Sequence, residues 1–313
     1  MNSHESHEGN ADAPIIGVII NPTAGRGAGA GVGAEVLAVL SHLGAQVVDL
    51  SSQSGAAAAD AGSAAISTGQ IDALFVVGGD GTVQLGVNLC ADTTVPLGVI
   101  EAGTGNDSAR ALGLHNLRPA ELVAKFLATL NSPRQVDVMR VVSSSETFWS
   151  FGSVSAGFDA LVNSRANKMA WPKGPSRYQV AMLAELASFK PIRYRAVIDG
   201  HERNFEAMLC VAANAQGFGG GMLIVPHAQV TDGFFDLLIL HKISRPELIK
   251  VFPKVYKGAH VNHPAVEFVR CRELHLEAIS DVHGAMPCFA DGEAKGHSPL
   301  QITLKAGLLK VLG

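Results

Sequence analysis

The sequence predicts an α/β nucleotide-binding domain with a parallel sheet, followed by a second, β-rich domain that forms an antiparallel sandwich. Three observations lead to this fold class. Short apolar runs alternate with helical segments from residue 14 to residue 134, glycine-rich turns follow three of those runs, and strand-like segments dominate residues 135–313. Strands that alternate with helices of this length form parallel sheets. A chain of 313 residues is long enough for two such domains.

The first domain consists of four apolar strands with helices between them. The predicted strands cover residues 15–20, 46–50, 71–77 and 95–100, and helices are expected at about 32–43, 56–67 and 82–89. Loops of glycine and polar residues follow the strands that end at Ile20, Val77 and Ile100. Because ligands of parallel sheets bind beyond the carboxyl ends of the strands, we expect these three loops at one edge of the sheet.

The second domain, residues 135–313, is predicted from segments with strand-like composition. Strands are expected at 135–142, 147–153, 193–198, 205–213, 234–240, 266–270, 273–279 and 300–304. Helices are expected at 178–189 and at 245–256, although Pro253 weakens the second. The extreme C-terminal segment can return to the first domain.

Composition excludes several classes of protein. A net charge of −4 gives no general attraction to nucleic acid. Residues 1–13 are polar and predict a disordered tail, not a signal peptide, and no apolar run reaches the roughly 20 residues of a membrane span. We expect a cytoplasmic protein, at most peripheral at the inner membrane face, with four reduced cysteines: Cys90, Cys210, Cys271 and Cys288.

The turn Gly78-Gly79-Asp80-Gly81-Thr82 joins a buried strand to a helix. Backbone N–H groups point outward at a helix start and the helix dipole favours anions there, so this turn suits a phosphate. Asp80 can hold a divalent cation beside that phosphate, or it can serve only as a helix cap. The turn is not a Walker loop, because no Gly-Lys-Ser/Thr follows it.

The two neighbouring loops carry the same types of residue. Asn21 and Thr23 precede glycines in the first loop, which is either a nucleotide-binding loop or an ordinary flexible turn. In the third loop, Gly103-Thr104-Gly105-Asn106-Asp107, Thr104 and Asn106 can bind phosphate or base. Asp107 can bind metal, directly or through water, or cap the helix that follows. Three such loops on one edge are less expected by chance than any one of them.

Two Asp-Gly pairs lie in the second domain. Asp291-Gly292-Glu293 follows an apolar stretch, and one of two neighbouring acids can accept a proton from a substrate hydroxyl. Asp232-Gly233 precedes a strand and can form an oxygen-rich loop for a hard cation. Either pair can instead be an ordinary hairpin turn.

Residues 165–195 combine seven basic residues and one acid with Trp171, Tyr178 and Phe189. Basic and aromatic side chains beside an amphipathic helix suit contact with an anionic membrane surface, but they also occur on solvated helix faces.

Taken in chain order, these motifs resemble the diacylglycerol kinase catalytic-domain family, which includes soluble bacterial lipid kinases and the sphingosine and ceramide kinases. The resemblance covers nearly the whole chain after the tail. Gly-Gly-Asp-Gly-Thr is shared with NAD kinases, whereas the 103–107 loop and the late Asp-Gly-Glu are specific to the lipid-kinase branch. The chain departs from the common pattern at Gln84 and Leu85, where many members have Asn-Glu, at Ser108 in place of Phe, and at Ala24 in place of Ser.

The resemblance implies a role for each position. ATP would be held by Asn21, Thr23, Gly78, Gly79, Asp80, Gly81, Thr82, Gly103, Thr104 and Asn106. Catalytic Mg²⁺ would be held at Asp80, with Asp107 in the metal network. Asp291 would be the general base, with Glu293 supporting the metal and water around it. Asp232 would ligate a structural Mg²⁺ with the backbone carbonyls of Gln229 and Phe234.

The resemblance therefore implies an ATP- and Mg²⁺-dependent lipid kinase, with diacylglycerol as the leading acceptor. Two alternatives remain open at this point: a kinase of another acceptor, such as a sphingoid lipid, phosphatidylglycerol or NAD, and a weakly catalytic nucleotide- or lipid-binding regulator. The implied partners are a lipid at a membrane surface and a second copy of the chain in a homodimer.

Overall fold

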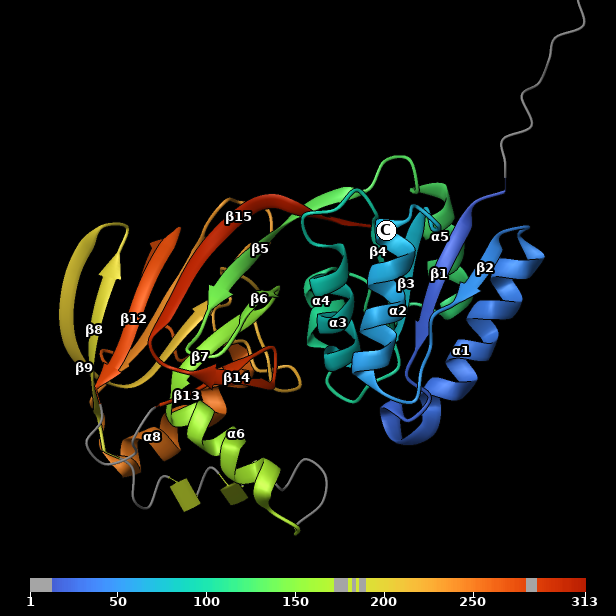
Figure 1. Cartoon of the computed structure of the whole chain (residues 1–313). Helices are drawn as coiled ribbons and strands as arrows, with labels where there is room; N and C mark the ends of the chain where they lie inside the picture. Colours follow the sequence, from blue (N-terminus) through green and yellow to red (C-terminus); the bar gives the residue numbers. More distant parts are fainter. Residues whose placement is uncertain (1–12, 172–179, 182–183, 186–189, 280–285) are drawn as a thin grey trace, which may run out of the picture.

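The computed structural model of this protein describes residues 13–171, 180–181, 184–185, 190–279 and 286–313. Figure 1 shows an α/β region on the right and a β-rich region on the left, which confirms the predicted fold class. The predicted helix at 178–189, and with it much of the 165–195 segment, lies largely outside the described residues, as does the tail up to residue 12.

The α/β region contains four parallel strands and five helices among the described residues. In chain order these are β1 (Ile15–Ile20), α1 (Ala24–His42), β2 (Gln46–Asp49), α2 (Gly55–Ser67), β3 (Ala73–Gly78), α3 (Asp80–Cys90), β4 (Leu97–Glu101), α4 (Asp107–Ala111) and α5 (Pro119–Ala128). Every residue of β3 is buried, as expected for a central parallel strand that helices cover on both faces.

The strand order of this region is β2-β1-β3-β4, with all pairs parallel. Helix α1 contacts α5, and α2 contacts α3, so the helices form two layers, one on each face of the sheet. Strand β2 lies on one side of β1, whereas β3 and β4 lie on the other, so the strand order reverses between β1 and β3. In doubly wound sheets the crevice at such a switch point is the usual ligand site.

The β-rich region contains the remaining elements. They are β5 (Arg134–Val142), β6 (Thr147–Ser150), β7 (Ser153–Gly157), α6 (Phe158–Lys168), β8 (Ile192–Ile198), β9 (His201–Ala213), β10 (Phe235–His241), α8 (Arg245–Val251), the 3₁₀ helix η1 (Phe252–Lys257), β11 (Val266–Cys271), β12 (Glu273–Ile279), β13 (Pro287–Ala290), β14 (Glu293–His297) and β15 (Leu300–Val311).

Apart from the contact of β15 with β4, strand pairing in this region is antiparallel. The long strand β9 pairs with β7, β8 and β10 and so links the layers around a second apolar core. Strand β15 pairs with β5 along most of its length and then joins β4 in parallel, where Leu312 N–H donates to the Leu97 carbonyl at 2.9 Å. The two regions are thus connected through one continuous sheet.

Several elements differ from those predicted. The predicted helix at 245–256 divides into α8 and η1 next to Pro253, which has no N–H to donate. The strand predicted at 147–153 ends at Ser150 as β6, and β7 begins at Ser153. The strand predicted at 300–304 continues to Val311, and α5, α6, β13 and β14 had no predicted counterpart. Helix α1 spans Ala24–His42, but Gly25, Arg26 and Gly27 have left-handed backbone, so its regular part follows Gly27 and still begins earlier than the predicted start near residue 32.

Candidate functional site

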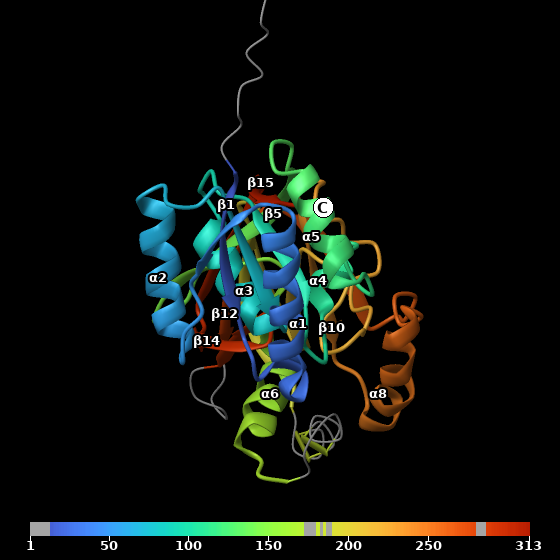
Figure 2. The same ribbon diagram turned by 90° about the vertical axis from the view of Figure 1, so that its right-hand side faces the viewer.

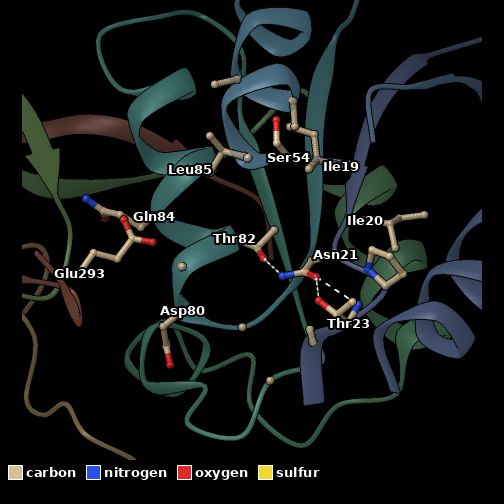
Figure 3. Close-up of a pocket in the computed structure, with 18 of the residues that line it drawn as sticks. Ile19, Ile20, Asn21, Thr23, Ser54, Asp80, Thr82, Gln84, Leu85 and Glu293 are labelled. Carbon is tan, nitrogen blue, oxygen red and sulfur yellow. Dashed lines mark hydrogen bonds between the residues drawn. The ribbon is translucent and has the colours of Figure 1, made fainter. Parts of the chain in front are cut away.

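The loop after β1 is held to the turn after β3 through Asn21. Its backbone N–H donates to the Val77 carbonyl at 2.9 Å, and its side-chain amide donates to Thr82 Oγ1 at 3.4 Å. Its side-chain oxygen accepts from the backbone N–H of Thr23 at 3.1 Å and from the Thr23 hydroxyl at 2.8 Å. Figure 3 shows these three side chains together at the floor of a pocket.

Glycines bring the three loops into backbone contact. A Cβ atom on Gly103 would lie 2.5 Å from the Cα of Gly79, and one on Gly25 would lie 2.2 Å from the Ala102 carbonyl oxygen. A Cβ on Gly78 would lie 2.2 Å from Thr82 Oγ1. Since real Cβ atoms do not approach other atoms so closely, a side chain at Gly103 or Gly25 would push two loops apart, and one at Gly78 would clash with Thr82 within its own turn.

Asp80 is the first residue of α3, and Gly79 occupies the cap position. Its carboxylate points away from Asn21, toward the third loop, where one oxygen accepts the Ser108 N–H at 3.1 Å. It therefore does not cap its own helix, and the α3 cap makes no side-chain hydrogen bond.

Asp107 connects the two regions. Its carboxylate accepts the backbone N–H groups of Gly220 at 2.7 Å and Gly221 at 2.8 Å, and a guanidinium N–H of Arg110 at 2.8 Å. Partial burial raises the pKa of Asp107, and the neighbouring charge of Asp80 adds to the effect. Direct metal binding by Asp107 would compete with these donors.

A pocket of about 880 Å³ lies between the three loops and the β13–β14 hairpin. It is comparable with ligand pockets in general, which span roughly 300–1,000 Å³. Its far end is formed by the start of α2 and by Ile19 and Ile20. Of the residues predicted to act in the site, these line the pocket: Asn21, Thr23, Gly79, Asp80, Gly81, Thr82, Gly103, Thr104 and Glu293.

Asp291 lies outside the pocket lining, in the turn between β13 and β14. It has left-handed backbone (φ 49°). One carboxylate oxygen accepts the backbone N–H groups of Gly152 and Ser153, both at 2.9 Å. The other accepts the Ser150 hydroxyl at 2.9 Å and the Phe151 N–H at 3.1 Å. Burial raises the pKa of Asp291 to about 6, against the effect of these donors. Asp291 is thus both a hairpin-turn residue and a rigidly held carboxylate.

Glu293 and Lys295 lie two residues apart on β14 and both line the pocket, because alternate residues of a strand point to the same face. The Lys295 ammonium lies 3.4 Å from Glu293 and 3.9 Å from Glu146. A Cβ on Gly81 would lie 2.9 Å from a Glu293 oxygen, so this carboxylate faces the start of α3. Lys295 is the one cationic residue of the pocket lining among the described residues. We did not predict it, although its i+2 relation to Glu293 was visible in the sequence.

Gln84 and Leu85, which differ from the residues common in the family pattern, also line the pocket. The Gln84 amide and the Asn88 amide both donate to the Trp149 carbonyl of β6, and the Asn88 oxygen accepts the Trp149 N–H at 2.9 Å. Helix α3 is therefore bonded to the second region at its middle turns. The side-chain oxygen of buried Gln84 has no hydrogen-bond partner within the described part of the chain.

The residues predicted for a structural cation lie apart from the pocket lining. One Asp232 oxygen is 2.6 Å from the Arg270 guanidinium and the other accepts the Phe234 N–H at 3.0 Å. Arg270 and Arg272 stack on the Phe234 ring, and Gln229 lies in the same loop. The described residues contain no cluster of three or more His, Cys, Asp or Glu side chains of the kind that holds a metal ion. Gly78, Asn106, Asp107 and Asp291 likewise lie outside the pocket lining.

Comparison with known proteins identifies the family. Residues 16–141 match the diacylglycerol kinase catalytic domain, and residues 152–313 match the YegS C-terminal NAD kinase β-sandwich-like domain. A diacylglycerol kinase of Mycobacterium tuberculosis is 36% identical over 299 residues, which cover 95% of this chain and 94% of the relative. The chain belongs to the diacylglycerol kinase catalytic-domain family. It is therefore a kinase, an ATP-dependent phosphotransferase with a hydroxyl acceptor, of the general lipid-kinase type.

Two further comparisons agree with this assignment. A diacylglycerol kinase of Bacillus subtilis is 29% identical over 290 residues, covering 90% of each chain. The crystal structure of a diacylglycerol kinase from Bacillus anthracis covers 96% of each chain with a TM-score of 0.69 at 20% identity, which shows a shared fold. Within the described residues, no helix of this kinase has both the length and the apolar composition that a membrane span needs.

Proposed function

We propose that this kinase transfers the γ-phosphoryl group of ATP, with Mg²⁺, to a lipid hydroxyl, and that diacylglycerol is the leading acceptor. One observation carries the proposal. The pocket has a wall of glycine-rich backbone at three strand ends and, opposite it, a wall with Glu293 and Lys295 on β14. The first wall suits a polyphosphate and the second suits its reacting end.

The backbone of the first wall fits a nucleotide. The start of α3 presents N–H groups without a side-chain cap, and the neighbouring glycines leave room for phosphate oxygens to reach them. Asn21, Thr23, Thr82 and Thr104 add side-chain partners, and Asn106 holds the third loop by accepting the Gly103 N–H at 3.0 Å. Lys295 supplies positive charge from the opposite side.

Mg²⁺ fits beside Asp80. Protein sites commonly hold this ion with one or two carboxylates together with substrate phosphates. Asp80 has an oxygen with no hydrogen bond among the described residues, so it is the first ligand that we propose, with Asp107 acting through water. When bound, the ion would neutralise charge that develops on the phosphates. The structural Mg²⁺ that we propose at Asp232, Gln229 and Phe234 would have to displace Arg270.

Asp291 is the proposed general base. The acceptor oxygen bonds to the γ-phosphorus, the bond to the bridging oxygen of ADP breaks, and the hydroxyl proton passes to an Asp291 oxygen. The Ser150 hydroxyl can turn from Asp291 to the Ser153 carbonyl oxygen, 3.3 Å away, and this rotation frees a lone pair for the proton. A pKa of about 6 makes Asp291 a better base than an ordinary Asp near neutral pH.

Labelled ATP distinguishes the acceptors. The kinase is incubated with Mg²⁺, γ-labelled ATP and separately with diacylglycerol, a sphingoid base, phosphatidylglycerol or NAD, and products are resolved after extraction. We expect label in the organic phase as the phosphomonoester of diacylglycerol. Label on NAD alone, or ATP binding by calorimetry without transfer to any acceptor, would contradict the proposal and favour the other kinase or the regulator. Gel filtration of the same preparation tests the proposed homodimer.

A further inference from the structure

Helix α8 and the 3₁₀ helix η1 form one unbroken helical segment at the surface of the second region. One side of it is buried through Leu248, Val251 and Val255. Two large apolar side chains face the other way: Ile249 is 51% exposed and Tyr256 is 47% exposed. Large apolar side chains exposed on a single segment need an explanation, because a solvated helix face is usually polar.

The exposed residues are arranged in two stripes. Ile249, Pro253 and Tyr256 follow one another at spacings of four and three residues, so they lie along one side of the segment. Lys250, Lys254 and Lys257 each follow one of them directly and form a parallel stripe of exposed cations. An apolar stripe beside a lysine stripe is the pattern of a helix that lies in the plane of a membrane surface.

Charge in this segment departs from that of the whole chain. Residues 242–257 contain five basic residues and a single acid, whereas the chain carries a net charge of −4. That acid, Glu247, lies 3.2 Å from a ring nitrogen of His263. The positive charge of the lysine stripe is therefore left to attract an anionic partner.

The position of the segment agrees with this partner. Figures 1 and 2 both place α8 at the same end of the molecule as α6 and the carboxyl end of β1. Just after α6, Trp171 is 79% exposed. The loop after β1, which lines the pocket, and the striped segment thus lie at the same end of the molecule.

We propose that the α8–η1 surface, made of Ile249, Tyr256, Lys250, Lys254 and Lys257, docks the kinase on an anionic lipid bilayer. The lysines contact lipid phosphates while Ile249 and Tyr256 enter the headgroup region. Docking here brings the end of the molecule that carries the pocket loops to the membrane that carries the acceptor, and in this respect the inference rests on the proposed lipid substrate. Docking itself requires no catalysis.

Vesicle sedimentation tests the surface. The full chain is spun with phosphatidylcholine vesicles that contain phosphatidylglycerol, and with pure phosphatidylcholine vesicles, at low and high salt. We expect binding to the anionic vesicles only, weakened by salt. The variant Lys250→Gln/Lys254→Gln/Lys257→Gln should bind about a hundredfold more weakly, since each lysine near such a surface contributes about fivefold. Ile249→Ser/Tyr256→Ser should weaken binding while keeping its salt dependence.

A second lysine triplet is the matched control. Lys125→Gln/Lys305→Gln/Lys310→Gln removes the same charge from α5 and β15 and should bind like the wild type. Equal binding by both triplets, binding to neutral vesicles, or no vesicle binding by the wild type would overturn the inference. Phosphorylation of a short-chain, detergent-dispersed diacylglycerol should be equal in all variants. If the wild type binds vesicles but does not phosphorylate diacylglycerol, the proposed function is contradicted and the docking surface is still supported.

Discussion

The two walls of the pocket use different parts of the polypeptide. The N-terminal wall consists of backbone at the ends of β1, β3 and β4, where glycines bring three loops within contact of one another. The C-terminal wall consists of charged side chains on the β13–β14 hairpin. Backbone amides can hold an anion without changing charge, whereas carboxylates and an ammonium can transfer a proton or respond to one. We expect the first wall to make most of the nucleotide contacts and the second to provide charged groups beside the reacting phosphate.

The two key carboxylates differ in the same way. Asp80 lines the pocket and accepts one N–H, from Ser108. Asp291 is not part of the lining and accepts four donors, one of them the Ser150 hydroxyl. One carboxylate is left with capacity for a cation, and the other is fixed in orientation with a raised pKa. The variants below test this division, beginning with the largest expected effect.

Replacement of Asp291 by Asn should reduce turnover most. A positioned general base contributes roughly 10²–10⁴-fold, and the amide of Asn cannot take the proton. The amide N–H₂ group would also face backbone donors, so some loss of stability is expected. Steady-state kinetics with saturating ATP and lipid measure the effect. Ser150→Ala keeps the carboxylate and serves as the control with a smaller loss. Wild-type turnover in the Asn variant would show that Asp291 is not the general base.

The same residue predicts a pH dependence of stability. Its pKa in the folded protein, about 6, is raised above the ordinary value of 3.8. Asp291 therefore contributes stability that is fully present below pH 3.8 and is lost as pH rises through 6. The two values differ by about two units, equivalent to about 3 kcal/mol in the free energy of unfolding. Denaturant unfolding between pH 4 and pH 7 should show this loss in the wild type and not in Asp291→Asn.

Asp80→Asn should lower turnover by roughly 10²–10³-fold, the usual effect of removing one electrostatic group from a transition state. The variant should require more Mg²⁺ for half-maximal activity, because an amide is a weaker ligand for a hard cation. Its melting temperature without nucleotide should change little, since only the Ser108 contact is altered. A large drop in melting temperature with an unchanged Mg²⁺ requirement would make Asp80 a structural residue.

Much of this arrangement could be predicted from the sequence, and the remainder could not for identifiable reasons. Alternation of apolar runs with glycine loops was sufficient for the fold class and for the choice of Asn21, Asp80 and the third loop. The donors around Asp291 could not be predicted, because they come from residues about 140 positions earlier in the chain. Lys295 was missed because the sequence does not show that β14 lies opposite the start of α3, and only this arrangement brings the lysine into the pocket lining.

Lys295→Met should weaken ATP binding by about tenfold, equivalent to about 1.4 kcal/mol, and ADP binding much less. The reason is that Lys295 reaches the pocket from the second wall, beside the start of α3, where the terminal phosphate is proposed to lie. Calorimetry with ADP and a non-hydrolysable ATP analogue measures the difference. Lys305→Met, which replaces an exposed lysine of β15, is the matched control. An equal loss for both nucleotides would place Lys295 near the other phosphates instead.

A pair of glycine variants, which change stability and leave the charged groups in place, tests whether the first wall depends on backbone contact. A Cβ on Gly103 would lie 2.5 Å from Gly79 Cα, which is backbone and cannot yield, so Gly103→Ala should cost roughly 1–3 kcal/mol. Gly31 lies within α1, and a Cβ there would meet nothing within 4 Å. Gly31→Ala should therefore raise stability by about 0.5–1 kcal/mol through helix propensity. Opposite signs in chemical denaturation are expected because only Gly103 keeps two loops in contact. Equal changes in the free energy of unfolding would mean that the loops tolerate separation. Contact between the loops would then not determine the shape of the N-terminal wall.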